Sequence, residues 1–313
     1  MSAVSQTKTL KSGVTIPVFH TDNPARSTFT PEELQYYRDN GAICISGVFN
    51  QNDLAAIRKA ADDLLDYCRP FLIGKPLLEI EKGQVEGHLV VRKIQPVVDA
   101  VPMLLEISRD QRIIKRAAAL LNDQPILFED KLNYKPPLVG SDFPIHHDWG
   151  YWKGHDSSLT NLLSVMIFFD DATEENGCMR IYPGSHKMDD YPLNGPVIAD
   201  GVLKREDSLP VPCPAGSILI FGCHTVHCSD PNFSSKPRRA LILSYHEASL
   251  GDKYDLRNGP GRECAKLWYA AFDIAVAAVR TGEAWERYRR TDDSHHAKWW
   301  NAGLERGVEY ART

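Results

Sequence analysis

The chain has 313 residues, 43% hydrophobic and 25% charged, and its formal net charge is −5. This length and hydrophobic content allow a large buried core, whereas the acidic balance and the absence of a basic tract argue against a nucleic-acid partner. No apolar run is long enough to span a membrane, and residues 1–11 lack the apolar centre of a signal peptide. We therefore expect a soluble, cytoplasmic protein.

The first 124 residues are expected to form an arm over 1–29 and a helical support over 30–124. Thr30 and Glu33 form a capping box that begins the first helix, and this helix is expected to stop near Gly41. The spacing of apolar residues predicts the elements that follow in this part: a strand over Ala42–Val48 and amphipathic helices over Asn52–Cys68 and Ser108–Leu121.

From residue 125 the pattern changes to short apolar runs separated by Gly, Pro, Asn and Asp, which is typical of strands. The predicted strands cover Ile126–Tyr134, Leu162–Phe169, Ser217–Phe221 and Ala240–Tyr245. This order predicts a mainly β protein with flanking helices, whose core over 125–250 is a double-stranded β-helix of the jelly-roll, cupin-like kind. We expect a single domain over 1–313.

The C-terminal segment, 251–313, returns to a helical pattern between Cys264 and about Arg290. Its aromatic residues are expected to pack an amphipathic helix; covering the mouth of the barrel and forming a homodimer contact are the alternatives. The aromatic residues of this segment are Trp268, Tyr269, Phe272, Trp285 and Tyr288.

Seven scattered cysteines include no pair spaced as Cys-x-x-Cys, which argues against a structural zinc site of that kind. We expect free thiols in a reducing compartment. The cysteines are Cys44, Cys68, Cys178, Cys213, Cys223, Cys228 and Cys264.

The triplet His146-His147-Asp148 lies within the β-rich part. If it is a strand, His146 and Asp148 share one face and can bind one metal, whereas His147 points away. Two histidines and one carboxylate form the ligand set of non-haem iron(II) oxygenases, although zinc accepts the same ligands. For the second histidine the residues alone leave His224 and His227 open.

Two arginines, Arg238 and Arg239, begin the predicted strand that follows. The planar guanidinium of an arginine can bind a carboxylate through two hydrogen bonds, as a dicarboxylate cosubstrate would require. Either arginine could instead be a solvated charge at the edge of the sheet.

Three motifs follow one another in the chain: His146-His147-Asp148, Asn176-Gly177 leading to Pro183-Gly184-Ser185-His186, and His227-Cys228-Ser229-Asp230-Pro231-Asn232 with Arg238 eleven residues after His227. In this order they resemble the phytanoyl-CoA dioxygenase family of iron(II)- and 2-oxoglutarate-dependent oxygenases, which includes ectoine hydroxylase. The resemblance covers about residues 28–246. The family usually has glycine where this chain has Cys228, which puts the local backbone shape in doubt.

The resemblance implies that His146, Asp148 and His227 bind Fe(II) and that Arg238 binds the distal carboxylate of 2-oxoglutarate. By the same resemblance, further residues of the 2-oxoglutarate pocket are Asn133, Phe143 and Ser229.

Substrate contacts are predicted at Trp152, Glu129 and Arg92, with Trp149 and Tyr151 as alternatives to Trp152. Trp152 resembles a pocket aromatic of the family, and Arg92 lies where related enzymes often have an arginine. Glu129 shares a strand face with Asn133. Each of these residues could instead be structural.

The implied activity consumes O2 and 2-oxoglutarate, releases succinate and CO2, and hydroxylates a small-molecule metabolite or natural-product intermediate. Desaturation, epoxidation and rearrangement are variants of it, and the carboxylate of Asp148 argues against halogenation. A coenzyme A thioester would need a basic entrance for its phosphates, and the sequence has no compact basic patch. We therefore do not expect an acyl-CoA substrate. The alternatives are a cupin-like metal-dependent isomerase or hydrolase that does not use 2-oxoglutarate, and a non-catalytic binding protein.

Overall fold

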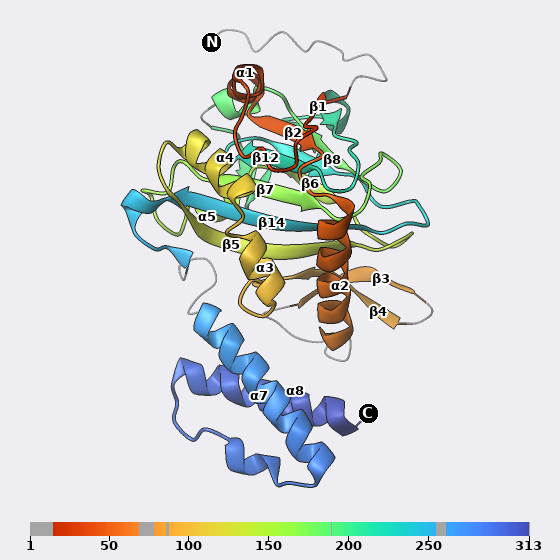
Figure 1. Cartoon of the computed structure of the whole chain (residues 1–313), viewed down its shortest axis with the longest axis vertical. Coiled ribbons are helices and arrows are strands. Elements are labelled where there is room, and N and C mark those ends of the chain that lie inside the picture. The colour runs from red at the N-terminus through yellow and green to blue at the C-terminus, as the bar shows by residue number, and fades with distance from the viewer. Residues whose placement is uncertain (1–14, 69–77, 86–87, 189, 255–260, 313) are drawn as a thin grey trace.

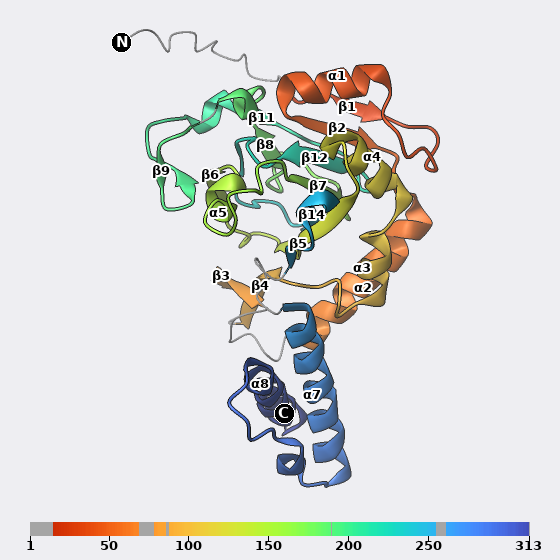
Figure 2. The same cartoon turned by 90° about the vertical axis from the view of Figure 1, so that its left-hand side faces the viewer.

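The computed structural model describes residues 15–68, 78–85, 88–188, 190–254 and 261–312. Two β-sheets face each other, and helices cover the outer face of the larger one (Figures 1 and 2). This arrangement confirms the predicted fold class. No helix within these ranges is both long and apolar enough to cross a membrane.

The major sheet has eight strands in the order β1-β2-β12-β7-β14-β5-β4-β3. Its central strand, β14, pairs antiparallel with β5 on one side and β7 on the other. The strands are β1 (Val18–His20), β2 (Ala42–Ser46), β3 (Leu78–Val85), β4 (His88–Ile94), β5 (Pro125–Lys135), β7 (Leu163–Phe168), β12 (Ile218–Gly222) and β14 (Arg238–Glu247).

The minor sheet has six shorter strands in the order β11-β8-β13-β6-β10-β9. Its central pair, β6 and β13, is antiparallel, with His146 opposite His227. The strands are β6 (Phe143–His146), β8 (Met179–Ile181), β9 (Leu193–Asn194), β10 (Val197–Ile198), β11 (Leu209–Pro210) and β13 (His227–Ser229).

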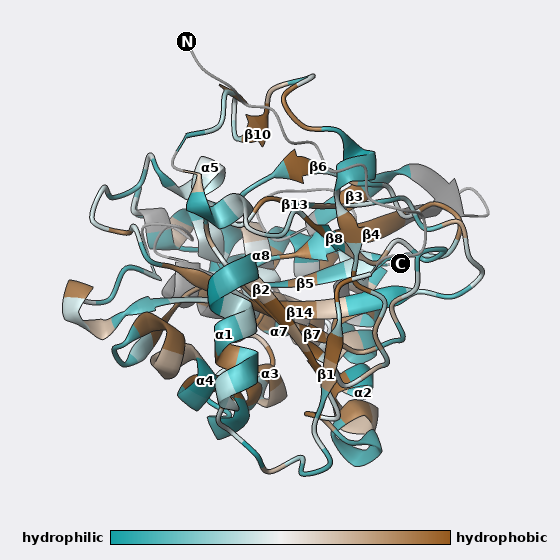
Figure 3. Cartoon of the chain, turned by 90° about the horizontal axis from the view of Figure 1, so that it is seen from above, coloured by the Kyte–Doolittle hydropathy of each residue, from teal (hydrophilic) through white to brown (hydrophobic). Residues whose placement is uncertain are grey.

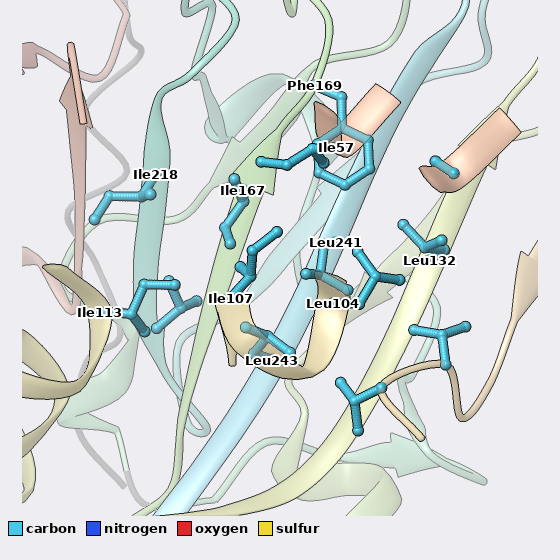
Figure 4. Close-up of a cluster of buried hydrophobic side chains, with 14 of the residues drawn as sticks. Ile57, Leu104, Ile107, Ile113, Leu132, Ile167, Phe169, Ile218, Leu241 and Leu243 are labelled. Carbon is cyan, nitrogen blue, oxygen red and sulfur yellow. The ribbon is translucent and has the colours of Figure 1, made fainter. Parts of the chain in front are cut away.

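The outer face of the major sheet is apolar and packs against three helices, α2 (Gln51–Cys68), α3 (Pro102–Ile107) and α4 (Gln111–Leu121). Figure 4 shows part of this cluster: Leu241 of the sheet lies close to Leu104 of α3, and Ile57 of α2 lies near Phe169. A second cluster, which includes Met166, Phe221 and Ile242, fills the space between the two sheets. In Figure 3 the sheet strands are mostly brown, whereas α1 (Pro31–Asn40) is mainly teal.

Residues of β14 and β5 alternate between these faces, except at an irregularity in their pairing. Ser244 is opposite Glu129, but Tyr245 is opposite Leu127, so Phe128 is an extra residue in β5. Such a β-bulge lets two consecutive side chains turn to the same side. Phe128 and Glu129 both contact Trp152: the Phe128 ring lies edge-on at 5.4 Å, and the Glu129 carboxylate accepts a hydrogen bond from the indole.

The N-terminal part agrees with the sequence analysis in some elements and differs in others. The capping box of Thr30 and Glu33 is confirmed, and Gly41 ends α1 in the left-handed conformation. The arm, by contrast, contributes β1, which pairs parallel with β2. The strand predicted over Ala42–Val48 is β2, and β3 and β4, which the sequence analysis did not predict, also join the major sheet.

The helix predicted over Ser108–Leu121 is α4, which begins at Gln111, and α3 is a separate helix that precedes it. The chain turns between them because the Asp110 side chain caps α4, with Oδ1 accepting a hydrogen bond from the Arg112 amide at 2.7 Å.

The C-terminal segment forms two packed helices, α7 (Gly261–Thr281) and α8 (His295–Arg312), rather than one. Figures 1 and 2 show them as a pair at one end of the molecule. They approach closely at Gly303, where a Cβ atom would lie 2.3 Å from the carbonyl oxygen of Trp268. The side chains of Trp268 and Phe272 are buried, and no described residue of either helix lines the cavity considered next.

The cysteine side chains that the structure describes are all buried free thiols, as the sequence analysis expects; Cys68 and Cys264 lie outside the described side chains. The five are Cys44, Cys178, Cys213, Cys223 and Cys228.

Candidate metal centre and cosubstrate cavity

The side chains of His146, Asp148 and His227 converge between the two sheets and are all buried. Asp148 Oδ1 lies 3.9 Å from His146 Nε2 and 3.8 Å from His227 Nε2. Two ligand atoms about 2.1 Å from one ion are at most about 4.2 Å apart, so these distances suit a single metal. Among the described residues this is the one group of three or more candidate ligands that could hold an ion.

Hydrogen bonds fix the orientation of both histidines. His146 Nδ1 lies 2.7 Å from the carbonyl oxygen of Pro144, and His227 Nδ1 lies 2.9 Å from that of Thr225. Because a carbonyl only accepts, each Nδ1 carries the hydrogen and each Nε2 keeps its lone pair for a metal. Burial lowers the pKa of both histidines, which further favours the neutral, metal-binding form.

The carboxylate of Asp148 is also held by a hydrogen bond to the oxygen that does not face the histidines. Ser164 Oγ, on β7, donates to Asp148 Oδ2 at 2.8 Å and lies 2.9 Å from Ser244 Oγ on β14. Oδ2 is thereby occupied, whereas Oδ1 faces the two histidines. The donor set and its supporting bonds therefore fit an iron(II) ion with the protein ligands on one side.

The backbone at Asp148 is not part of a strand, which differs from the assumption of the sequence analysis. Strand β6 ends at His146, and Asp148 stands at the start of the short helix α5 (Trp149–Trp152) in a helical conformation. The two ligands still converge because the chain turns at this point. His147 does point elsewhere: its ring lies 6.2 Å from the ring of His224.

His224, the competing candidate for the second histidine, belongs to the opposite side of this turn. It lies 5.4 Å from the ring of Trp149. His227 begins β13 and is directly opposite His146 across the sheet. Ser185, from the Pro-Gly-Ser-His motif, accepts a hydrogen bond from the Val226 amide at 2.9 Å and so anchors the segment that leads into His227.

A cavity extends from the three candidate ligands to Arg238. Arg238 is 1% exposed, and its Nε and Nη1 have no hydrogen-bond partner among the described residues. The side-chain oxygen of Asn133, which also lines the cavity, likewise has none. Burial lowers the pKa of Arg238 to about 10.

An unpaired guanidinium in a protein interior is costly unless an anion joins it. Arg239, the next residue, shows the contrast: it forms two 2.9 Å hydrogen bonds with the carboxylate of Asp170 on the other face of the strand. Of the two arginines, Arg238 is therefore the one that lines the cavity with donors left unpaired among the described residues.

The structure brings six of the ten predicted site residues to this cavity: His146, Asp148, His227, Arg238, Asn133 and Phe143. The other four do not line it. Ser229 is buried and hydrogen-bonded to Lys135 Nζ at 2.7 Å. Trp152 and Glu129 are also buried and contact each other. The Arg92 guanidinium stacks on Phe143 at 4.0 Å and binds the carbonyl oxygen of Asp142 at 2.9 Å.

Sequence reasoning missed one charged residue of the cavity wall, Lys131. It lies between Glu129 and Asn133 in β5. The signal was present, because residues two apart on a strand share a face. Both of its neighbours on that face were named as site residues, so the same alternation indicates Lys131.

The fold and the site define a class: a jelly-roll dioxygenase with one iron(II) ion and a dicarboxylate cosubstrate. The sequence model of phytanoyl-CoA dioxygenase (PhyH) matches residues 37–240, and the chain belongs to this family. It is an iron(II)- and 2-oxoglutarate-dependent dioxygenase of small molecules.

Three known proteins illustrate the similarity. Ectoine dioxygenase of Sphingopyxis alaskensis is 25% identical over 284 residues, which cover 84% of this chain and 90% of that protein. Methylphosphonate hydroxylase of Gimesia maris is 34% identical over 141 residues, 44% of this chain and 51% of its own. The crystal structure of EctD from S. alaskensis with 2-oxoglutarate and 5-hydroxyectoine matches the fold with a TM-score of 0.60 at 24% identity, over 73% of this chain and 78% of that one.

Proposed function

We propose that His146, Asp148 and His227 hold Fe(II), that Arg238 binds the distal carboxylate of 2-oxoglutarate, and that the enzyme hydroxylates a small-molecule metabolite. Bound Fe(II) activates O2 in a reaction that converts 2-oxoglutarate to succinate and CO2. The observation that carries this proposal is the buried Arg238, which has two unpaired donors in the same cavity as the three candidate ligands.

The residues of the chain contribute position and exclusion of water. Arg238 presents donors at the far end of the cavity, where Asn133 also lines the wall, and apolar side chains such as Met166, Phe221 and Ile242 line the space between the sheets. Phe143, fixed under the Arg92 guanidinium, closes one side. A dry cavity strengthens each of these polar interactions.

The carboxylate of Asp148 favours hydroxylation, or a related desaturation, epoxidation or rearrangement, over halogenation. Ser164 holds this carboxylate in place, so the third protein ligand is present. A metal-dependent isomerase or hydrolase without a dicarboxylate cosubstrate would leave Arg238 buried and unpaired, which disfavours that alternative.

Several relatives act on small acids. Besides methylphosphonate hydroxylase, they include a 2-aminoethylphosphonate dioxygenase from an uncultured bacterium, 25% identical over 72% of this chain. These names support a small, charged metabolite as the substrate. A cytoplasmic location and a homodimer contact through α7 and α8 remain predictions, the latter to be checked by light scattering of the purified protein.

The test is binding of 2-oxoglutarate to the iron(II) protein without oxygen, followed by its weak visible charge-transfer band. We expect wild type to form the band and Arg238→Ala to need at least about tenfold more 2-oxoglutarate, because a charge-assisted, two-pronged contact is lost. Arg239→Ala is the matched control, since it removes the same charge from the adjacent residue, which lies outside the cavity.

A wild-type protein that forms no band, or equal affinities in the two arginine variants, would contradict the proposal. With oxygen, succinate release and mass spectrometry of candidate metabolites identify the product, as a gain of one oxygen atom or a loss of two hydrogens.

A further inference from the structure

Three side chains form a connected chain that leads to the cavity: Trp152 and Glu129 are buried, and Lys131 is partly buried. Glu129 is 0% exposed, and its Oε2 accepts a hydrogen bond from Trp152 Nε1 at 3.2 Å. Its other oxygen, Oε1, forms an ion pair with Lys131 Nζ. The indole is held by the edge contact with Phe128. The ammonium of Lys131 is therefore held in one place rather than left on a flexible stem.

Lys131 stands at the metal end of the cavity, apart from Arg238. It lines the cavity together with the three candidate ligands. Across the sheet Lys131 is opposite Ile242, whereas Arg238 is opposite Lys135. These positions are four residues apart on β14, which is about 13 Å along a strand. The cavity thus has one fixed cation at each end.

The two ends of a 2-oxoglutarate molecule already have partners in the proposed site, since Arg238 and Asn133 serve the far carboxylate and the metal serves the near end. The other cation of the cavity, Lys131, therefore serves a different anion. An ammonium has three donors, so it can keep Glu129 behind it and bind an anionic oxygen in front. Glu129 offsets the charge when no substrate is present, which makes a partly buried lysine tolerable.

We propose that Lys131 binds an acidic group of the substrate, a carboxylate or a phosphonate, beside the metal, with Glu129 and Trp152 as positioning residues. The inference rests on the proposed function and narrows its substrate to small acids. It also gives Glu129 and Trp152, which the sequence suggested as substrate contacts, an indirect role: they act through Lys131.

The experiment measures binding of two small acids, methylphosphonate and acetate, to the anaerobic protein loaded with iron(II) and 2-oxoglutarate, by calorimetry. We expect wild type to bind at least one of them, and Lys131→Met to bind it at least about tenfold more weakly, because a buried charge pair loses one partner. Lys131→Arg should retain part of the affinity. Dimethyl methylphosphonate, the neutral ester, should not distinguish wild type from Lys131→Met.

Two further variants keep the result interpretable. Lys93→Met is the matched control, because Lys93 lies on the neighbouring strand, is paired with Glu79 at 2.7 Å and does not line the cavity. It should bind the acids as wild type does. Should Lys131→Met fail to fold with Glu129 left unpaired, the double variant E129Q/K131M removes both charges together, and it should show the same loss.

The charge-transfer band of 2-oxoglutarate separates the two proposals. If wild type forms the band but Lys131→Met or the double variant binds the acids unchanged, the role of Lys131 is refuted and the proposed function stands. The role is equally refuted if wild type binds neither acid, or if Lys131→Met weakens 2-oxoglutarate binding and not acid binding. If wild type forms no band, the proposed function itself fails.

Discussion

The two faces of the major sheet differ in character although they alternate along the same strands. On β14, Leu241 and Leu243 point to the helices and join an entirely apolar cluster. The even-numbered residues point between the sheets, and two of them, Arg238 and Ser244, carry polar groups there. The comparison indicates that the outer face provides stability and the inner face provides chemistry, so substitutions on the two faces should have separable effects.

The sharpest test on the inner side is Asp148→Ala. The variant lacks one of three candidate ligands, so turnover of 2-oxoglutarate should fall by more than the roughly 100-fold that loss of an outer hydrogen bond to a metal ligand can cost. Succinate release measures it, with thermal unfolding as the check that the fold persists. Turnover close to that of wild type would show that the inner face does not hold the metal in the proposed way.

On the outer face, Leu241→Ala should reduce the free energy of unfolding by about 2–5 kcal/mol, because it opens a cavity in a fully buried cluster. Urea unfolding measures this loss. Below the unfolding transition, affinity for 2-oxoglutarate should match that of wild type. Should 2-oxoglutarate affinity fall as steeply as stability, the two faces would not be separable.

Behind the metal ligands, Ser164→Ala removes the hydrogen bond to Asp148 Oδ2. We expect affinity for iron(II) to fall by about 10- to 100-fold, since this bond orients a ligand. Metal titration against a chelator gives the value. Ser217→Ala, a buried serine that bonds only to the carbonyl oxygen of Pro214 in the described contacts, should leave iron affinity unchanged.

The smallest expected effect is on the pH dependence of stability. Burial, with Arg238 and Arg92 nearby, lowers the pKa of Lys135 to about 6, against about 10.4 in the unfolded chain. Between these values the unfolded state holds the proton and the folded state does not, so this residue makes stability rise with pH. Lys135→Met should remove its share of the rise between about pH 6 and pH 9. Unfolding midpoints of both proteins across that range provide the measurement, and parallel curves would contradict the expectation.

Local signals in the sequence were sufficient for much of the fold and part of the site. Apolar alternation located β5, β7, β12 and β14, and the capping box located α1. His146 and Asp148 were found as neighbours in the chain. The choice of His227 over His224 required the spacing known from a family, because only strand pairing, which is a long-range contact, places His227 opposite His146.

What the sequence could not supply depends on contacts between distant segments. Trp152 and Glu129 resemble pocket residues, but their mutual hydrogen bond buries both and could not be read from either segment alone. The edge strands β3 and β4 also escaped prediction, since their pairing with the sheet, not their composition, makes them strands. Arg238 and Arg239 differ only by the face of β14 to which each points.

The bulge at Phe128 has a consequence for how this strand can change length. Lys131 and Asn133 line the cavity, and the extra residue takes up one step of the alternation before them. Deleting a residue on the C-terminal side of the bulge would turn Lys131 and Asn133 toward the helices, whereas deleting Phe128 would restore a regular pairing and keep both in the cavity. The strand can therefore gain or lose a residue upstream of the bulge without changing the face to which Lys131 and Asn133 point.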